Sequence, residues 1–106
     1  MIYNQLLSNT KHKDKSFPQL YNLLIRVFCM KSKVDIFVIQ KVKEKRKELG
    51  ISQRGMAEIL GCSPSFIGQI ESDKFDMKYS VHQLYVIAQE FECSPADFFP
   101  PFDTDL

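Results

Sequence analysis

The stretch from Gln53 to Ser72, QRGMAEILGCSPSFIGQIES, constrains the fold of this chain more than any other. Two short helices can cross at a tight turn only if the first has a small side chain at the contact, and Ala57 provides one. Gly61 can adopt the left-handed backbone that such a turn needs. Ile67 and Ile70 would bury one face of the second helix and leave the other free. The spacing therefore predicts a helix pair with one outward face.

Serine residues mark the starts of these two helices. Ser52 can cap the first of the pair, which is expected to run to about Leu60. Ser63 is followed by Pro64, and this order favours a helix start because the serine oxygen accepts a free amide and proline fits the first helical position.

Apolar spacing predicts three further helices and no strand. The first spans about 35–49 and ends at Gly50. Its buried face should contain Val38, Ile39, Val42 and Leu49. The fourth opens at the Ser80/Gln83 capping pattern, and a fifth starts at Ser94-Pro95. The apolar stripe of the fourth is Val81, Leu84, Tyr85, Ala88 and Phe91.

The net charge of +1 conceals an uneven distribution. Residues 31–54 carry eight lysines and arginines against three acids, whereas residues 55–106 carry two lysines against nine acids. A protein that docks one face on phosphates would have such a basic end, although a solvated charged helix would explain it equally well.

Several functional classes lack their usual signatures. No run of about 18 apolar residues suggests a membrane span. The cysteines Cys29, Cys62 and Cys93 are far apart, and no paired cysteines or clustered histidines offer metal-ligand spacing. A Gly-rich phosphate loop, a Ser-His-Asp arrangement and a framed carboxylate pair are also missing. We therefore expect a reduced cytoplasmic protein that is not an enzyme and takes no metal or cofactor.

Residues of about 37–99 resemble the Cro/C1-type, or XRE-type, helix-turn-helix family of bacterial and phage regulators. The resemblance rests on the entry Gly50-Ile51-Ser52-Gln53, the Ala57 and Gly61 pair, the ending Ile67, Ile70 and Glu71, and the later stretch LYVIAQEFECSPADFF. It implies an all-α, five-helix, lambda-repressor-like DNA-binding domain over residues 34–100, followed by a short tail at 101–106.

Residues 1–33 form an N-terminal extension outside that domain. Met30 opens MKSKVDIFVIQKVKEK, which looks like a natural start for a minimal domain of this family. Residues 1–29 are therefore interpreted as a gene-start artefact, or alternatively as an extra helix used for dimer contacts.

The resemblance also assigns roles to particular residues. Arg46 and Glu71 match a pair that clamps the first and third helices together. The full structural set is Arg46, Ala57, Gly61, Ile67, Ile70 and Glu71. The expected DNA base contacts are Ser63, Ser65, Phe66 and Gln69. The expected phosphate contacts are Lys43, Lys47, Gln53, Arg54, Lys74 and Lys78. The resemblance implies this role for Gln53, and positive charge predicts it for the others.

The third helix departs from a strong base reader, because no arginine or lysine occurs from Ser63 to Ser72. Gln69 alone has the length and the paired donor and acceptor that suit adenine. Gly68 weakens the helix, which indicates either a close approach of its backbone to something or relief of packing.

The expected function is a transcriptional regulator, a repressor above all, that binds double-stranded DNA as a homodimer. Phe98, Phe99 and Phe102 are the apolar residues considered for dimer contacts, with covering of the domain's own core as the competing role. Two alternatives remain: a DNA-binding antitoxin with a toxin partner, and a helix-turn-helix scaffold used only for protein contacts.

Overall fold

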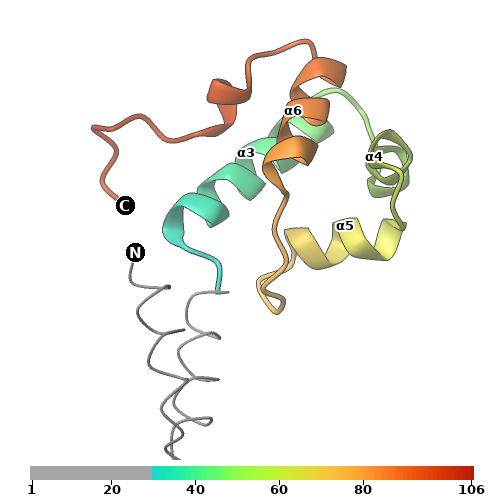
Figure 1. The fold of residues 1–106 in the computed structure, drawn as a ribbon, viewed down its shortest axis with the longest axis horizontal. Coiled ribbons are helices and arrows are strands. Elements are labelled where there is room, and N and C mark those ends of the chain that lie inside the picture. Colours follow the sequence, from blue (N-terminus) through green and yellow to red (C-terminus); the bar gives the residue numbers. More distant parts are fainter. Residues whose placement is uncertain (1–29) are drawn as a thin grey trace, which may run out of the picture. The chain divides into compact units, whose positions relative to one another are not determined.

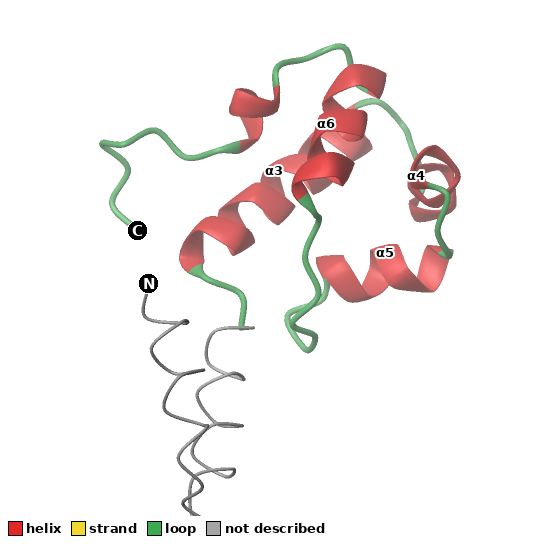
Figure 2. Ribbon diagram, viewed as in Figure 1, coloured by secondary structure: helices red, strands yellow, loops and turns green. Residues whose placement is uncertain are grey.

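The structure is a computed structural model that describes residues 30–106. The predictions for residues 1–29 lie outside the described part of the chain. Within it there are four α-helices, one short 3-10 helix and no strand (Figures 1 and 2). These elements are α3 (Lys33–Glu48), α4 (Gln53–Leu60), α5 (Pro64–Glu71), α6 (Val81–Glu90) and η1 (Pro95–Phe98). The prediction of an all-α fold is confirmed for these residues.

The fifth predicted helix is a single 3-10 turn, so the count of five helices is not confirmed. Ser94 and Pro95 start this turn as expected, but the backbone is already extended at Phe99. Pro100 and Pro101 follow directly. A residue before proline is driven away from the helical region, and proline cannot supply the amide that would continue the helix.

Each helical element of residues 30–106 is preceded by a serine whose hydroxyl accepts a backbone amide two or three residues later. The caps are Ser32, Ser52, Ser63, Ser80 and Ser94. The first helix begins at Lys33 rather than at about residue 35, because Ser32 and Asp35 form a reciprocal capping box that the sequence reading missed. Ser80 and Gln83 form the capping box that was predicted for α6.

One core lies between α3, α4, α5, α6 and η1. Met56, Ile67, Ile70 and Ile87 are fully buried in it, and Phe98 packs edge-on against Phe91 with ring centroids 6.5 Å apart. Three predicted core positions are wrong. Leu49 lies beyond the end of α3 and is half exposed, while Val81 and Tyr85 lie on the outer side of α6. The buried stripe of α6 is instead Leu84, Ile87, Ala88 and Phe91.

The ends of the helices fall into two kinds. α3, α4 and α6 are each followed by a residue with positive φ, namely Gly50 at 70°, Gly61 at 67° and Glu92 at 54°. Each of these ends also has the two reverse hydrogen bonds of a Schellman motif, such as Cys62 N–H to the Ala57 carbonyl at 3.0 Å. α5 ends differently, because Ser72 is extended and no left-handed residue follows it.

Candidate nucleic-acid interface

α4 and α5 form the crossed pair that the spacing predicts. Gly61 takes the left-handed conformation between them, and Ala57 is buried where the helices meet. Ile67 and Ile70 turn one face of α5 fully into the core. On the opposite face Ser65 is exposed, and Gly68 and Gln69 are partly exposed.

A buried ion pair fixes the end of α5 against α3. Arg46 donates from Nε to Glu71 Oε2 and from Nη2 to Glu71 Oε1, each at 2.9 Å. Its remaining nitrogen Nη1 donates to the Ile51 carbonyl at 2.7 Å. The side chains of Arg46 and Glu71 are only 7% and 3% exposed. This bidentate geometry orients both partners and leaves neither charge unpaired in the interior.

Gln53, the first residue of α4, lies against the same carboxylate. Its amide nitrogen Nε2 donates to Glu71 Oε1 at 3.1 Å. A methyl group built on Gly68 would lie 3.5 Å from Gln53 Oε1, which is an ordinary van der Waals contact. Packing inside the protein therefore does not require a glycine at this position. Gln53 braces α5 while its side chain remains exposed.

The start of α5 presents short polar groups. Ser63 Oγ accepts the Phe66 amide at 3.2 Å and lies 3.2 Å from Ser65 Oγ. Ser63 and Ser65 are exposed, and Gln69 is half-buried. Phe66 packs partly against the core, so less of its ring is free for a base contact than the sequence suggested.

A helix-turn-helix domain family matches residues 39–99, more than half of the chain. The chain belongs to the helix-turn-helix domain family. This family lies in the XRE-like group of helix-turn-helix domains, and such a domain indicates DNA binding. No curated protein and no solved structure gives a significant match.

The basic residues of this helix-turn-helix domain differ in how free they are. Lys47, Arg54 and Lys74 are exposed, and Lys43 is partly exposed. Lys78 instead pairs with Asp35, with its ammonium 3.1 Å from Oδ2 and its side chain 32% exposed. A phosphate would have to compete with this carboxylate, so Lys78 is the least available of the expected phosphate contacts.

Lys31 is a functional candidate that sequence reasoning missed. Its ammonium donates to the carbonyls of Ile70 at 2.8 Å and Ser72 at 2.7 Å, at the end of α5. Burial lowers the pKa of Lys31, and the nearby carboxylates Asp73, Asp76 and Asp35 oppose that change. The contact joins residues about forty positions apart, and no local pattern announces it.

Tyr79 is a buried residue whose hydroxyl is influenced by the charges of Arg46 and Glu71. The residue is 8% exposed, and its hydroxyl is buried without a hydrogen-bond partner among the described residues. Burial raises the pKa of Tyr79, the Glu71 carboxylate adds to this effect, and the Arg46 guanidinium opposes it. The hydroxyl therefore stays protonated and costs desolvation energy with no bond in return.

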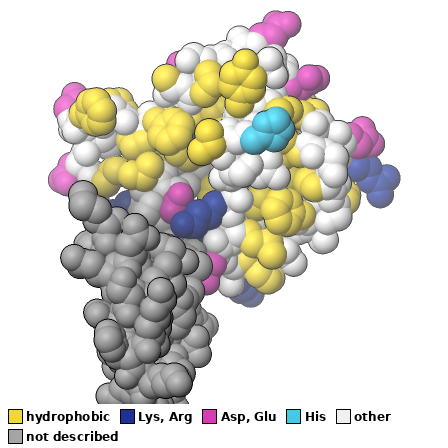
Figure 3. Space-filling model, viewed as in Figure 1, with side chains coloured by type: hydrophobic (Ala, Val, Ile, Leu, Met, Phe, Trp, Pro, Cys, Tyr) yellow, Lys and Arg dark blue, Asp and Glu magenta, His cyan; other side chains and the backbone are white. Residues whose placement is uncertain are grey.

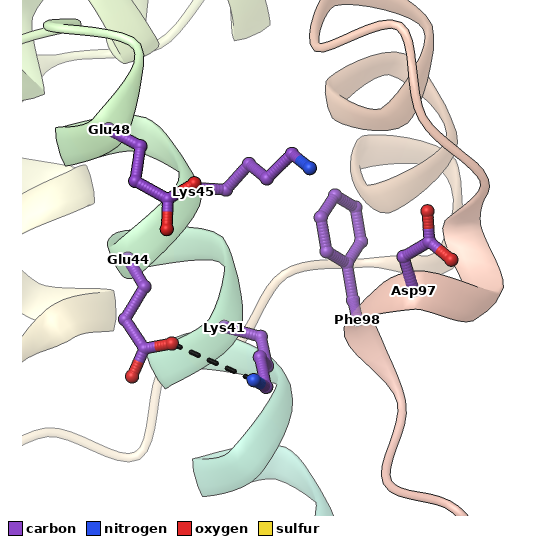
Figure 4. Close-up of a pocket in the computed structure, with 6 residues that line it drawn as sticks. All are labelled: Lys41, Glu44, Lys45, Glu48, Asp97 and Phe98. Atoms are coloured by element: carbon purple, nitrogen blue, oxygen red, sulfur yellow. Dashed lines mark ion pairs between the residues drawn. The ribbon is translucent and has the colours of Figure 1, made fainter.

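One cavity has walls that carry both signs of charge. The cavity in Figure 4, about 190 Å³, lies between α3 and η1 and has Lys41, Lys45, Glu44 and Asp97 on its walls. The ammonium of Lys41 already lies 3.8 Å from Oε2 of Glu44. Residues 30–106 contain no cluster of three or more His, Cys, Asp or Glu side chains that could hold a metal ion. No helix in this part of the chain is long and apolar enough to cross a membrane.

Proposed function

We propose that this helix-turn-helix protein is a sequence-specific transcriptional regulator of the Cro/C1 type, and that it acts as a repressor. The α5 helix, which spans Pro64–Glu71, enters the major groove in this proposal. The observation that carries it is the support of α5. Its inner face is fully buried and its end is fixed by the Arg46–Glu71 pair, while its outer face offers only polar or small groups to a partner.

The division of roles follows from side-chain chemistry. Gln69 is the residue we assign to base reading, because a terminal amide can donate to and accept from adenine at once, worth about 1–3 kcal/mol of discrimination. Lys47, Arg54 and Lys74 are exposed and supply the phosphate contacts. The side chains of Ser63 and Ser65 are too short to do more than supplement the base contacts of Gln69.

A homodimer completes the proposal, since two-fold DNA sites require two copies of the reading helix. Phe98 is 1% exposed and belongs to the core, so it is removed from the candidates for the dimer contact. Phe99 is 46% exposed and Phe102 is fully exposed. Figure 3 shows hydrophobic side chains in several patches on one face of the molecule, with few basic groups among them.

The function is tested by selecting bound duplexes from a random pool and measuring affinity for the selected duplex and for a scrambled one. Gln69→Ala is expected to lower the preference between the two, whereas Arg54→Ala and Lys74→Ala weaken both equally. Each true phosphate contact should remove about 0.9 from the slope of log affinity against log salt. Equal losses on both duplexes for Gln69→Ala would refute its assigned role.

A role in protein contacts alone is the second candidate. It is favoured by the absence of lysine and arginine from α5 and by the exposure of Val81 at 85% and Tyr85 at 55% on α6. A DNA-binding antitoxin combines both activities. Lack of any salt-dependent binding to duplex DNA would favour the scaffold, and co-purification of a toxin at equal stoichiometry would favour the antitoxin.

A further inference from the structure

The end of α5 lacks the cap that closes the other three α-helices of residues 30–106. Their last carbonyls accept amides from a left-handed turn at Gly50, Gly61 or Glu92. After α5 the backbone is extended at Ser72, and the Ser72 amide bonds back only to Gln69. The final carbonyls of a helix carry partial negative charge and need donors, which water or another part of the chain can supply.

Lys31 satisfies the end of α5 from the segment that precedes α3. One ammonium group donates to both the Ile70 carbonyl at 2.8 Å and the Ser72 carbonyl at 2.7 Å. A cation at a helix C-terminus interacts favourably with the helix dipole as well as with individual carbonyls. Lys31 therefore caps α5 from a distant part of the same chain, 39 and 41 residues away in the sequence.

We propose that Lys31 is a positioning residue for the reading helix. Together with Arg46 it ties the end of α5 to α3, and so it sets the angle at which the open face of α5 meets a groove. This inference rests on the proposed function, because it concerns how the DNA-reading helix is held.

The surroundings of Lys31 separate this role from a phosphate contact. α5 has eight residues, so its end lies about 12 Å from its reading end. The ammonium is partly buried, points at carbonyls and has Asp35, Asp73 and Asp76 as its charged neighbours. A DNA phosphate would be repelled by these carboxylates, whereas a helix terminus is already in place.

The test compares Lys31→Met, Lys31→Arg and the control Lys33→Met in the full chain. Lys33 is an exposed lysine two residues away on α3, and methionine removes the charge while keeping the length of the side chain. Affinity is measured for the selected and scrambled duplexes at several salt concentrations, well below the unfolding temperature. Amide hydrogen exchange in residues 69–72 is measured without DNA.

Lys31→Met should weaken binding to the selected duplex about threefold to tenfold and bind the scrambled duplex almost as before, with the salt slope unchanged. Exchange at residues 69–72 should become faster. Lys31→Arg should restore most of both properties, and Lys33→Met should change neither the preference nor the exchange.

Several results would overturn the inference. A salt slope reduced by about 0.9, with equal losses on both duplexes, would make Lys31 a phosphate contact. A lower unfolding temperature with unchanged affinity and preference would make it a stability residue only. If the unaltered protein binds no duplex, the proposed function fails and takes the DNA role with it. The exchange measurement then still shows whether Lys31 holds α5, and unchanged exchange would refute that as well.

Discussion

The two faces of α5 are built from opposite materials. The inner face carries Ile67 and Ile70, both fully buried, and ends in Glu71, which is held by a bidentate arginine. The outer face offers short or neutral groups, of which Gly68 and Gln69 are the most informative. The interactions that hold α5 in position are therefore much stronger than those its outer face can offer to a partner. The difference teaches that position, and charge on neighbouring segments, must supply most of the affinity for a partner.

The largest expected effect comes from breaking the ion pair between Arg46 of α3 and Glu71 of α5. Arg46→Met leaves the Glu71 carboxylate buried and unpaired, so the free energy of unfolding should fall by about 3–5 kcal/mol. Urea denaturation monitored by far-UV circular dichroism measures this change. Arg46→Met combined with Glu71→Leu removes both charges and should recover most of the loss. If the double variant is as unstable as the single one, packing of the guanidinium and not pairing is what stabilises this face.

The next effect concerns the buried hydroxyl of Tyr79. Tyr79→Phe removes a group that lost its water on folding and gained no partner among the described residues. The free energy of unfolding should rise by about 1–3 kcal/mol because the desolvation cost disappears. Thermal and urea unfolding would both report it. A decrease would mean that the hydroxyl has a hydrogen-bond partner that stabilises the fold.

Much of the fold could be predicted because its signals are local. Ser52, Ser63 and Ser80 each act through an amide three residues away, and Gly61 acts through its own backbone. Their effects can be read from short windows of sequence. The errors at Val81 and Tyr85 arose because helical spacing alone allowed more than one apolar stripe on α6. The position of the neighbouring helices decides between them, and that is tertiary information.

The candidate interface was less predictable because its contacts join residues that are far apart in the sequence. The pairing of Arg46 with Glu71 was expected only through a family resemblance, since no local rule links residues 25 apart. The contacts of Lys31 with α5 and of Lys78 with Asp35 had no signal at all, because any exposed lysine looks alike in a sequence. Charge indicated a basic end of the molecule but could not show which lysines were already engaged.

Gly68 gives the sharpest separation of the two faces, because stability and binding should change in opposite directions. Gly68→Ala should stabilise the protein by about 0.5–1 kcal/mol, since alanine favours the helix and its methyl group meets only Gln53 Oε1, at 3.5 Å. It should weaken DNA binding if the outer backbone approaches the groove closely. Unfolding and duplex affinity are measured on the same preparation.

The matched control is Gly61→Ala, which also adds one methyl group but at a φ of +67°. It should destabilise the protein by about 1–2 kcal/mol because a left-handed backbone is strained for alanine. Gly68→Ala with higher stability and unchanged affinity would show that the outer face does not need its glycine. A loss of stability would mean that packing against Gln53 is tighter than the geometry indicates.

The smallest expected effect is the pH dependence of the ion pair between Asp35 of α3 and Lys78, which lies in the segment after α5. Burial alone would raise the pKa of Asp35, but hydrogen bonds from the Ser32 amide and hydroxyl and the Lys78 ammonium outweigh it and lower the pKa. A carboxyl whose pKa is lower in the folded state stabilises the fold above its unfolded pKa of about 3.9, and this contribution is lost as pH falls through the folded value.

Asp35→Asn keeps an oxygen that can accept the Ser32 amide but has no charge to lose. The difference in unfolding free energy between the unaltered protein and Asp35→Asn should therefore be largest near neutral pH and shrink below about pH 4. Urea midpoints at pH 7 and pH 3 measure this difference, and a gap that stays constant across that range would show that the charge of Asp35 contributes nothing to holding the segment after α5.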